Sequence, residues 1–528
     1  MNRDAADKGR VIPRRQFLEA SAGAFSAAGL ASCAFREATL ENEATRKRPN
    51  VLFLMDDQHR GDCLGCEGHP VVQTPNLDRL AREGARFRRA YSSLPSCLPA
   101  RMTLLTGQSP WGHGLLGYSA IPERLPISKP RIFGENGYHT HAVGKMHFQP
   151  QRNTHGYHRT ILEEGWHTRL KTDFKCDYTQ WFDKTAPNKN LNATGLGYTD
   201  HRSRHFPFDE CLHPTNWTAR QGIEFLENYD GAKPFFLKIS FQRPHPPFDP
   251  PKRFMDLYAD ADLPKAQVGE WSAKLYAKPL GPPDPNRERN APVGNFGEEA
   301  VRESRIGYYG AVSHVDEQIG RVLEVLEKRG FLENTFILFT TDHGDMMGDH
   351  HLWRKTYPYE GSARIPMILR WPKGMLAGAK RGRALSQPVE LRDVLPTFLD
   401  AAGIPVPDGV EGRSLLDPVR GRTAGWREFI DLEHAQIYFP ENQWNALTDG
   451  RWKYIYGAVD GSQRLFDLEN DPYETNDLSG DPRHAGTLAE WRGRLIEHLS
   501  LRGERWVKDG DLTLRKKRIM HGPNFPPA

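Results

Sequence analysis

The segment 97–107 contains the residue types from which a nucleophilic active site can be built. Cys97 stands just ahead of a predicted helix, with Pro99 suited to its first turn and Gly107 to its end. The N-terminus of a helix presents free N–H groups to an anion, and Arg101 adds a cationic fork. These residues predict a nucleophile beside a pocket for a negatively charged group. The alternative, an inert core thiol, is disfavoured by the flanking proline and arginine.

Other reactive side chains follow directly on short apolar runs that are typical of buried parallel strands. The four runs are residues 51–55, 140–144, 235–241 and 336–341. Ligands of open α/β sheets bind beyond the carboxyl ends of the strands, so we expect the polar residues after these runs to converge. They are Asp56, Asp57, Lys145, His147, His245, Asp342 and His343. Paired acids such as Asp56 and Asp57 are often turn residues, but their place after a buried strand favours metal binding.

Helices must separate these strands in a doubly wound sheet, and the spacing of apolar residues predicts them. The predicted helices are residues 74–84, 312–326 and 389–402, the last with a kink at Pro396. Beyond about residue 420 we expect an antiparallel α+β subdomain, with a hairpin around Asp449-Gly450, a strand at 464–468 and a helix at 486–500. The predicted fold is therefore α/β, a large mixed, mostly parallel sheet sandwiched by helices, with a smaller C-terminal α+β subdomain.

Segment 97–107 also matches the C-x-P-x-R-x-x-x-L-T-G signature of the type I, formylglycine-dependent sulfatases, a family of the alkaline-phosphatase-like superfamily. The chain resembles this family from about residue 49 to about residue 500. Further matching motifs occur in the family's order and rough spacing. They are 56–57, 137–140, 144–147, 244–245, 342–344, Lys355 with 359–360, 393–397 and 465–472.

This resemblance implies an enzyme that cleaves sulfate monoesters. Cys97 would be oxidised to formylglycine, whose hydrated aldehyde attacks sulfur and forms a covalent sulfo-enzyme intermediate. One divalent cation would be held by an oxygen of residue 97 together with Asp56, Asp57, Asp342 and His343. Three carboxylates suit Ca²⁺. Many sulfatases have Asn where this chain has His343, and an imidazole also suits Mn²⁺.

The resemblance also implies roles for the remaining matched side chains. Arg101 and the metal would polarise the sulfate oxygens, and Lys145 and Lys355 would neutralise charge on the transferring group. His245 is the candidate acid for the leaving alcohol, a task that Lys355 could share. His147 would accept the proton of the second hydroxyl, which expels sulfate and regenerates the aldehyde.

The N-terminal segment resembles an export signal. Residues 13–18, Pro-Arg-Arg-Gln-Phe-Leu, are similar to a twin-arginine motif, and small and apolar residues follow from 20 to 34. Residues 30–33 also resemble a lipoprotein cleavage box in which Cys33 carries the lipid; the alternative is a plain signal cut nearby. The expected segments are a signal peptide at 1–33, a linker at 34–48, the sulfatase catalytic domain at 49–420 and the C-terminal subdomain with its tail at 421–528.

Export in this form implies two partners, the twin-arginine machinery and a formylglycine-generating enzyme, and a place in the periplasm or cell envelope. Residues 1–48 hold nine basic and six acidic residues and so carry three of the four units of net positive charge. The rest of the chain is nearly neutral, which argues against nucleic acid as a partner. With 38% hydrophobic residues, the composition argues against a polytopic membrane protein.

Two other functions stay open. A phosphonate monoester or phosphodiester hydrolase of the same superfamily would fit the His343 variant. An inactive carbohydrate-binding relative would require Cys97 to remain a thiol. For a sulfatase, export makes a sulfated glycan a sensible substrate without identifying one.

Several other residues have ordinary explanations. Cys63 and Cys66 form either a local disulfide or two thiols, because no second pair completes a zinc site. Asp316 is expected to be a structural hydrogen-bonding group. Surface or outer-sphere acids are expected at Asp345 and Asp349, and weaker candidates for substrate contact are His113, His350 and His351. The Pro- and Gly-rich stretch 276–297 is expected to be a long loop, and the tail 522–528 to be loose.

Overall fold

The computed structural model of the protein describes residues 48–164, 173–278 and 290–526. The predicted signal segment, Cys33 and nearly all of the predicted linker lie outside these residues, as does the middle of the predicted loop 276–297. From Pro49 onward the chain forms one compact unit.

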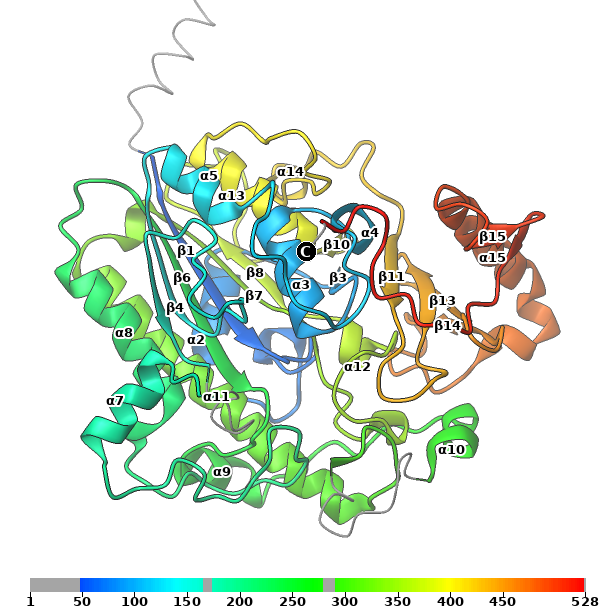
Figure 1. Cartoon of the computed structure of the whole chain (residues 1–528), viewed down its shortest axis with the longest axis horizontal. Coiled ribbons are helices and arrows are strands. Elements are labelled where there is room, and N and C mark those ends of the chain that lie inside the picture. Colours follow the sequence, from blue (N-terminus) through cyan, green and yellow to red (C-terminus); the bar gives the residue numbers. More distant parts are fainter. Residues whose placement is uncertain (1–47, 165–172, 279–289, 527–528) are drawn as a thin grey trace, which may run out of the picture. The chain divides into compact units, whose positions relative to one another are not determined.

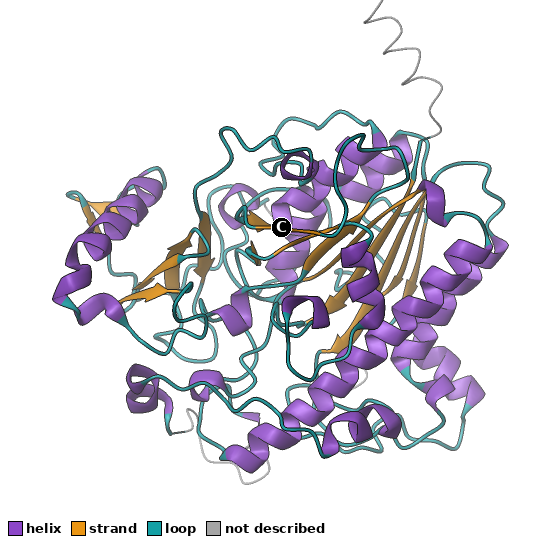
Figure 2. Ribbon diagram, turned by 180° about the vertical axis from the view of Figure 1, so that it is seen from behind, coloured by secondary structure: helices purple, strands orange, loops and turns teal. Residues whose placement is uncertain are grey.

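An eight-stranded mixed sheet forms the centre of this unit (Figures 1 and 2). In spatial order its strands are β5 (Arg159–Leu162), β4 (His139–Gly144), β6 (Phe235–Pro244), β1 (Asn50–Asp57), β7 (Thr335–Thr341), β8 (Met367–Arg370), β2 (Ala85–Phe87) and β9 (Arg383–Leu385). The first five run parallel to one another, whereas β8 is antiparallel to both of its neighbours. The four predicted strands are therefore confirmed as adjacent parallel strands, β4, β6, β1 and β7.

Helices cover both faces of the sheet, as the alternation of buried side chains along β1 requires. Val51, Phe53 and Met55 belong to one hydrophobic core, and Leu52 and Leu54 to another. The first core is completed by α3 (Cys97–Thr106), α5 (Lys129–Glu135) and α13 (Val394–Ala402), and the second by α2 (Pro75–Arg82), α8 (Pro214–Asn228) and α11 (Glu298–Lys328). The two groups of helices lie on opposite sides of the sheet in Figure 1.

Shorter elements connect these layers. They are α4 (Pro110–His113), α7 (Asp177–Thr185), α9 (Lys252–Ala259), α10 (Glu270–Tyr276), α12 (Glu360–Ala363) and α14 (Leu416–Val419), with a parallel pair of strands, β3 (Ala90–Tyr91) and β10 (Val389–Glu390).

The predicted C-terminal antiparallel subdomain is confirmed. Its sheet runs β11 (Ile430–His434), β12 (Trp444–Thr448), β13 (Trp452–Gly457) and β14 (Gln463–Asp467). Helix α15 (Ala485–Ser500) packs on it through Trp491 and Leu495, which share a core with Leu447 and Leu465. A short hairpin, β15 (Val507–Lys508) and β16 (Asp511–Leu512), follows.

The predicted helix 389–402 is wrong at its start. Val389 and Glu390 pair with β3, and a capping box between Glu390 and Asp393 follows, so α13 begins only at Val394. Pro396 therefore stands in the first helical turn, where a missing N–H removes no intrahelical hydrogen bond, and the prediction of a kink there has no basis.

The expectation of a loose tail is also wrong for the described part, residues 522–526. The Gly522 amide donates to the Gly114 carbonyl over 2.7 Å, and the Asn524 side chain donates to the carbonyl of Trp111 over 3.1 Å. Apolar contact explains this order, because the Phe525 ring stacks on His521 at a centroid distance of 4.0 Å.

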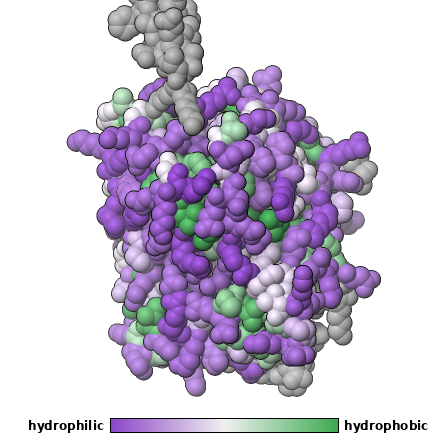
Figure 3. Space-filling view, turned by 90° about the vertical axis from the view of Figure 1, so that its left-hand side faces the viewer, coloured by the Kyte–Doolittle hydropathy of each residue, from purple (hydrophilic) through white to green (hydrophobic). Residues whose placement is uncertain are grey.

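Among the described residues, no helix is long and apolar enough to cross a membrane. The face shown in Figure 3 is largely hydrophilic, and the hydrophobic side chains visible on it gather in small separate patches.

Candidate active site

The predicted convergence of polar residues is confirmed, because the carboxyl ends of the parallel strands deliver buried side chains to one place. Residues from the strand ends and the adjoining loops contact Cys97, the first residue of α3. The buried set is Asp57, Cys97, Arg101, Lys145, His147, His245, Asp342, His343 and Lys355. Ser96, in an extended conformation, precedes the helix, and Gly107 ends it with a φ of +67°. Cys97 thus occupies the helical N-terminus rather than the position just ahead of it.

Three groups surround the Cys97 sulfur. The Lys355 Nζ donates to Sγ over 3.0 Å, and the Nε2 of His343 lies 3.2 Å from it. The Oδ1 of Asp57 lies 3.9 Å away. A nucleophile at this position would have a cation, an imidazole and a carboxylate in direct contact.

Arg101, one helical turn further on, ties the strand ends together. Its Nε donates to Asp342 over 2.9 Å and its Nη2 donates to Asp57 over 2.9 Å. Its Nη1 donates to the Lys145 carbonyl over 2.7 Å. The Lys145 Nζ lies 2.7 Å from the same Asp57 oxygen that Arg101 binds. Most of the Arg101 fork is therefore occupied by protein groups, so the residue fixes the two carboxylates in place.

The remaining atoms of this group fit a divalent cation. Asp57, Cys97, Asp342 and His343 each offer a ligand atom, and these atoms all lie within 4.8 Å of one another. The Nδ1 of His343 donates to the Gly344 carbonyl over 2.9 Å, which leaves Nε2 with its lone pair facing the carboxylates. Burial lowers the pKa of His343 to about 4, so the imidazole is neutral at neutral pH, as a metal ligand must be.

Asp56 is the predicted ligand that this group of four does not include. Its Oδ2 accepts a hydrogen bond from His59 Nδ1 over 2.6 Å, while its Oδ1 is buried and has no hydrogen-bond partner among the described residues. Strand β1 is irregular here, because its register with β6 shifts between Met55 and Asp57, so the alternation of a regular strand does not decide where Asp56 points. The contact that distinguishes Asp56 from Asp57 is the hydrogen bond to His59.

Comparison with known proteins assigns the family. The sulfatase family model matches residues 49–404, and the model of the N-sulphoglucosamine sulphohydrolase C-terminal region matches residues 348–500. The chain belongs to the sulfatase family. It is 40% identical to an arylsulfatase of Clostridium perfringens over 479 residues, which cover 89% of this chain and 98% of that protein. It is 32% identical to a choline-sulfatase of Rhizobium meliloti, over 86% of this chain and 87% of that protein.

Solved structures support the same fold. A phosphonate monoester hydrolase of Agrobacterium radiobacter superposes with a TM-score of 0.71 at 27% identity, covering 87% of this chain and 96% of that one. The predicted alkaline-phosphatase-like architecture is therefore confirmed, and the chain is an enzyme of the sulfatase type.

The two other predicted histidines of the sulfatase site are also buried. Burial, together with the cations of Lys355 and Lys145, lowers the pKa of His245 well below its usual value, and burial and Lys145 do the same for His147. The Nδ1 of His245 donates to the Pro246 carbonyl over 2.9 Å, which leaves Nε2 for a substrate. Both histidines are thus neutral at neutral pH before substrate binds.

Positive charge exceeds negative charge around Cys97. Burial alone would raise the pKa of Asp57, but the neighbouring cations of Lys145, Arg101 and Lys355 outweigh it and hold that pKa well below its usual range. Among the described residues, the carboxylates of Asp57 and Asp342 stand against three cations, those of Arg101, Lys145 and Lys355. Such a site favours an anion.

Sequence reasoning missed two residues that touch these cations. Gln58 accepts a hydrogen bond from Lys355 Nζ over 3.0 Å, and its amide donates to Asp345 over 2.5 Å. The Tyr198 hydroxyl accepts from Lys145 Nζ over 3.1 Å, and its ring centroid lies 4.3 Å from that of His245. Gln58 could have been found because it follows Asp57 directly. Tyr198 stands in an irregular segment between α7 and α8 that carries no pattern.

Most of the residues for which the sequence suggested a structural role make contacts away from Cys97. Asp316 accepts hydrogen bonds from the amides of Asn76 and Leu77 and so caps α2 as a structural group. Both Cys63 and Cys66 are free thiols. His113 contacts Thr103 and His350 contacts Ser272.

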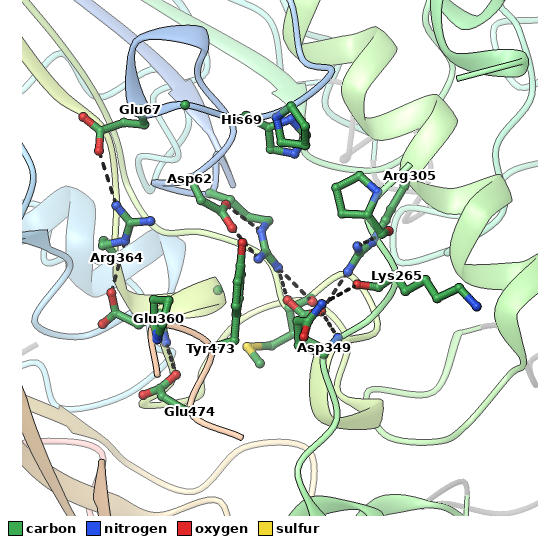
Figure 4. A pocket seen from close by; sticks show the side chains of 18 of the residues that line it. Asp62, Glu67, His69, Lys265, Arg305, Asp349, Glu360, Arg364, Tyr473 and Glu474 are labelled. Carbon is green, nitrogen blue, oxygen red and sulfur yellow. Dashed lines mark hydrogen bonds and ion pairs between the residues drawn. The ribbon is translucent and has the colours of Figure 1, made fainter. Parts of the chain in front are cut away.

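Away from Cys97, a cavity of about 370 Å³ is lined by charged groups that pair with one another (Figure 4). Two networks of ion pairs lie on either side of Tyr473. They are Glu67–Arg364–Glu360 and Arg60–Asp349–Arg305. Arg60 also donates to the carbonyls of Asp345 and Met346, so the second network holds the loop that follows Asp342 and His343.

The geometry predicts that Asp57 and Asp56 differ in metal binding. In the isosteric variants, D57N should weaken Ca²⁺ or Mn²⁺ binding at least 100-fold, because it removes a charged ligand, whereas D56N should change it less than tenfold. Calorimetric titration of chelator-treated protein with each metal measures the two affinities. Equal losses in both variants would make Asp56 a ligand after all.

Proposed function

We propose that this sulfatase hydrolyses sulfate monoesters after oxidation of Cys97 to formylglycine. The observation that carries the proposal is the position of Cys97, at the N-terminus of α3 and among the ligand atoms of Asp57, Asp342 and His343. Burial and the neighbouring Asp57 raise the pKa of the Cys97 thiol. An unmodified residue would therefore be a protonated, weak nucleophile, which favours a modified side chain as the reacting group.

When present, formylglycine supplies a hydrated aldehyde as an oxygen nucleophile, and a Ca²⁺ or Mn²⁺ ion held by Asp57, Asp342 and His343 supplies Lewis-acid polarisation. Lys355 and Lys145 bind the sulfate oxygens beside residue 97 and neutralise their charge. Arg101 holds the carboxylates of Asp57 and Asp342. This division of tasks revises the sequence-based role of Arg101 from direct sulfate contact towards positioning.

His245 and His147 move protons. The Nδ1 of His245 is fixed by the Pro246 carbonyl, which leaves Nε2 for proton transfer, and the residue lines the cavity beside Lys355. A bound sulfate anion would oppose the cations that lower the pKa of His245, so substrate binding favours the protonated form that can donate to the leaving alcohol. His147, neutral because it is buried beside Lys145, can accept a proton when residue 97 is regenerated.

A second candidate function is hydrolysis of phosphonate monoesters or phosphate diesters. The structural similarity to the Agrobacterium radiobacter phosphonate monoester hydrolase supports it, because that relative is 27% identical over 87% of this chain. The arylsulfatase and choline-sulfatase relatives, at 40% and 32% identity, favour sulfur over phosphorus.

The N-terminal motif further leads us to propose a place for the reaction. A twin-arginine signal at residues 13–18 would send the enzyme to the periplasm or cell envelope, with or without a lipid at Cys33. Sulfated glycans are among the substrates that an exported sulfatase could meet, and a relative from Bacteroides thetaiotaomicron is an N-acetylglucosamine-6-O-sulfatase.

Side-by-side kinetics test the proposed reaction. The metal-loaded enzyme from a host that matures formylglycine should hydrolyse an aryl sulfate with a kcat/KM at least tenfold above those for the matching phosphate diester and phosphonate monoester. The C97A variant should lose all three activities. A clear preference for either phosphorus ester would overturn the sulfatase proposal in favour of the second candidate.

The role of His245 gives a sharper prediction about the leaving group. H245N should slow hydrolysis of an unactivated alkyl sulfate by at least 100-fold, because a poor leaving group needs the proton, but that of 4-nitrophenyl sulfate by less than tenfold. Steady-state kcat values for the two esters give the comparison. Equal losses for both would assign His245 to binding rather than proton donation.

A further inference from the structure

Beside the catalytic groups lies a small cavity that could hold the alcohol part of the ester. It measures about 200 Å³ and opens next to His245 and Lys355. Its walls are mostly aromatic or apolar and include Tyr118, Tyr198, Pro246, Ile437 and Tyr438. Rings of this kind stack on a flat or ring-shaped group, so the cavity suits one aryl or sugar ring.

Arg354 is the charged residue of this cavity that the proposed mechanism does not use. The residue is only 8% exposed. Its Nη2 donates to the Thr199 carbonyl over 3.1 Å and its Nε lies 3.4 Å from His201 Nε2. Its guanidinium carbon is 5.5 Å from the centroid of the Tyr438 ring.

Within the described part of the chain, no carboxylate forms an ion pair with Arg354. The nearby acid Asp345 accepts a hydrogen bond from the Arg354 backbone amide and from Gln58, not from the guanidinium. The described residues that line the cavity also include no Asp or Glu. A buried guanidinium without a counter-charge is costly, and its planar fork matches a carboxylate or sulfate.

We propose that Arg354 recognises a second negative charge on the substrate, so that the preferred ester is a sulfate whose alcohol carries a carboxylate or another sulfate on its ring. This inference rests on the proposed sulfate ester hydrolysis and names its substrate class. It also separates this enzyme from a hydrolase of cationic alcohols, because Arg354 and Lys355 would repel a quaternary ammonium group and the described cavity wall offers no acid to bind one.

Three aryl sulfates that differ only in the charge of the para substituent test this specificity. They are 4-carboxyphenyl sulfate, its neutral methyl ester and 4-(trimethylammonio)phenyl sulfate. In each case the wild-type kcat/KM is divided by that of R354Q, so the intrinsic reactivity of the leaving group cancels. We expect a ratio of about ten or more for the carboxylate, mainly through KM, below two for the methyl ester and below one for the ammonium compound.

Further variants keep the experiment decisive. R354K retains the charge and should keep part of the preference for the carboxylate, while R483Q, at an exposed arginine of the C-terminal region, should leave all three values unchanged. If R354Q fails to fold, inhibition of the wild type by 4-hydroxybenzoate should still be at least fivefold tighter than by its methyl ester.

The possible failures are distinguishable. Equal ratios for the three esters, or equal inhibition by the two phenols, would overturn the inference and leave sulfate ester hydrolysis intact. Hydrolysis of none of the three esters, with turnover of a phosphonate monoester, would overturn the proposed function and the inference together.

Discussion

The whole site depends on one buried contact, the guanidinium of Arg101 held between Asp57 and Asp342. Asp57 ends β1 and Asp342 follows β7, so this single side chain of α3 locks a helix onto two adjacent parallel strands. Each partner would be unstable there alone, because an unpaired charge is expensive to bury. Together they place Cys97, one turn before Arg101, against the same carboxylates.

The charged side chains around Cys97 fall into two groups, those that are paired with an opposite charge and those that are not. Asp57 and Asp342 are partly neutralised by Arg101 and Lys145, whereas Lys355 donates only to Gln58 and Cys97 among the residues that the structure describes. This leaves positive charge next to residue 97, where the sulfate must sit. Neutral histidines at 147 and 245 complete the site, since their low pKa values follow from burial beside these same cations. An anionic substrate therefore restores the balance on which proton transfer depends.

Much of this arrangement could be predicted from the sequence because regular strands impose it. Asp57 ends its parallel strand, and Lys145, His245 and Asp342 directly follow theirs, so these residues must come to one edge of the sheet, as the structure confirms. The motif around Cys97 further identified the helix and the family. The role of Asp56 was harder to predict, because the sequence shows only two adjacent acids. The structure adds that one oxygen of Asp56 accepts a hydrogen bond from His59.

Residues on irregular segments could not be predicted in the same way. Tyr198, Tyr438 and Arg354 reach the cavity from loops whose paths depend on tertiary contacts rather than on any periodicity. The start of α13 was missed because an apolar residue followed by an acid, as at Val389 and Glu390, also fits the first turn of a helix. Only their pairing with β3 makes these two residues a strand. Specificity, which resides in such loops, is therefore less visible in the sequence than the catalytic groups.

The chemical state of residue 97 is the central claim, and mass spectrometry of the tryptic peptide of residues 90–101 from native-host protein tests it most directly. Formylglycine at position 97 would appear as loss of the sulfur atom and reactivity of the peptide towards aldehyde-trapping reagents. That is the result expected here. An intact thiol that can be alkylated, in protein that is active on sulfate esters, would contradict the account.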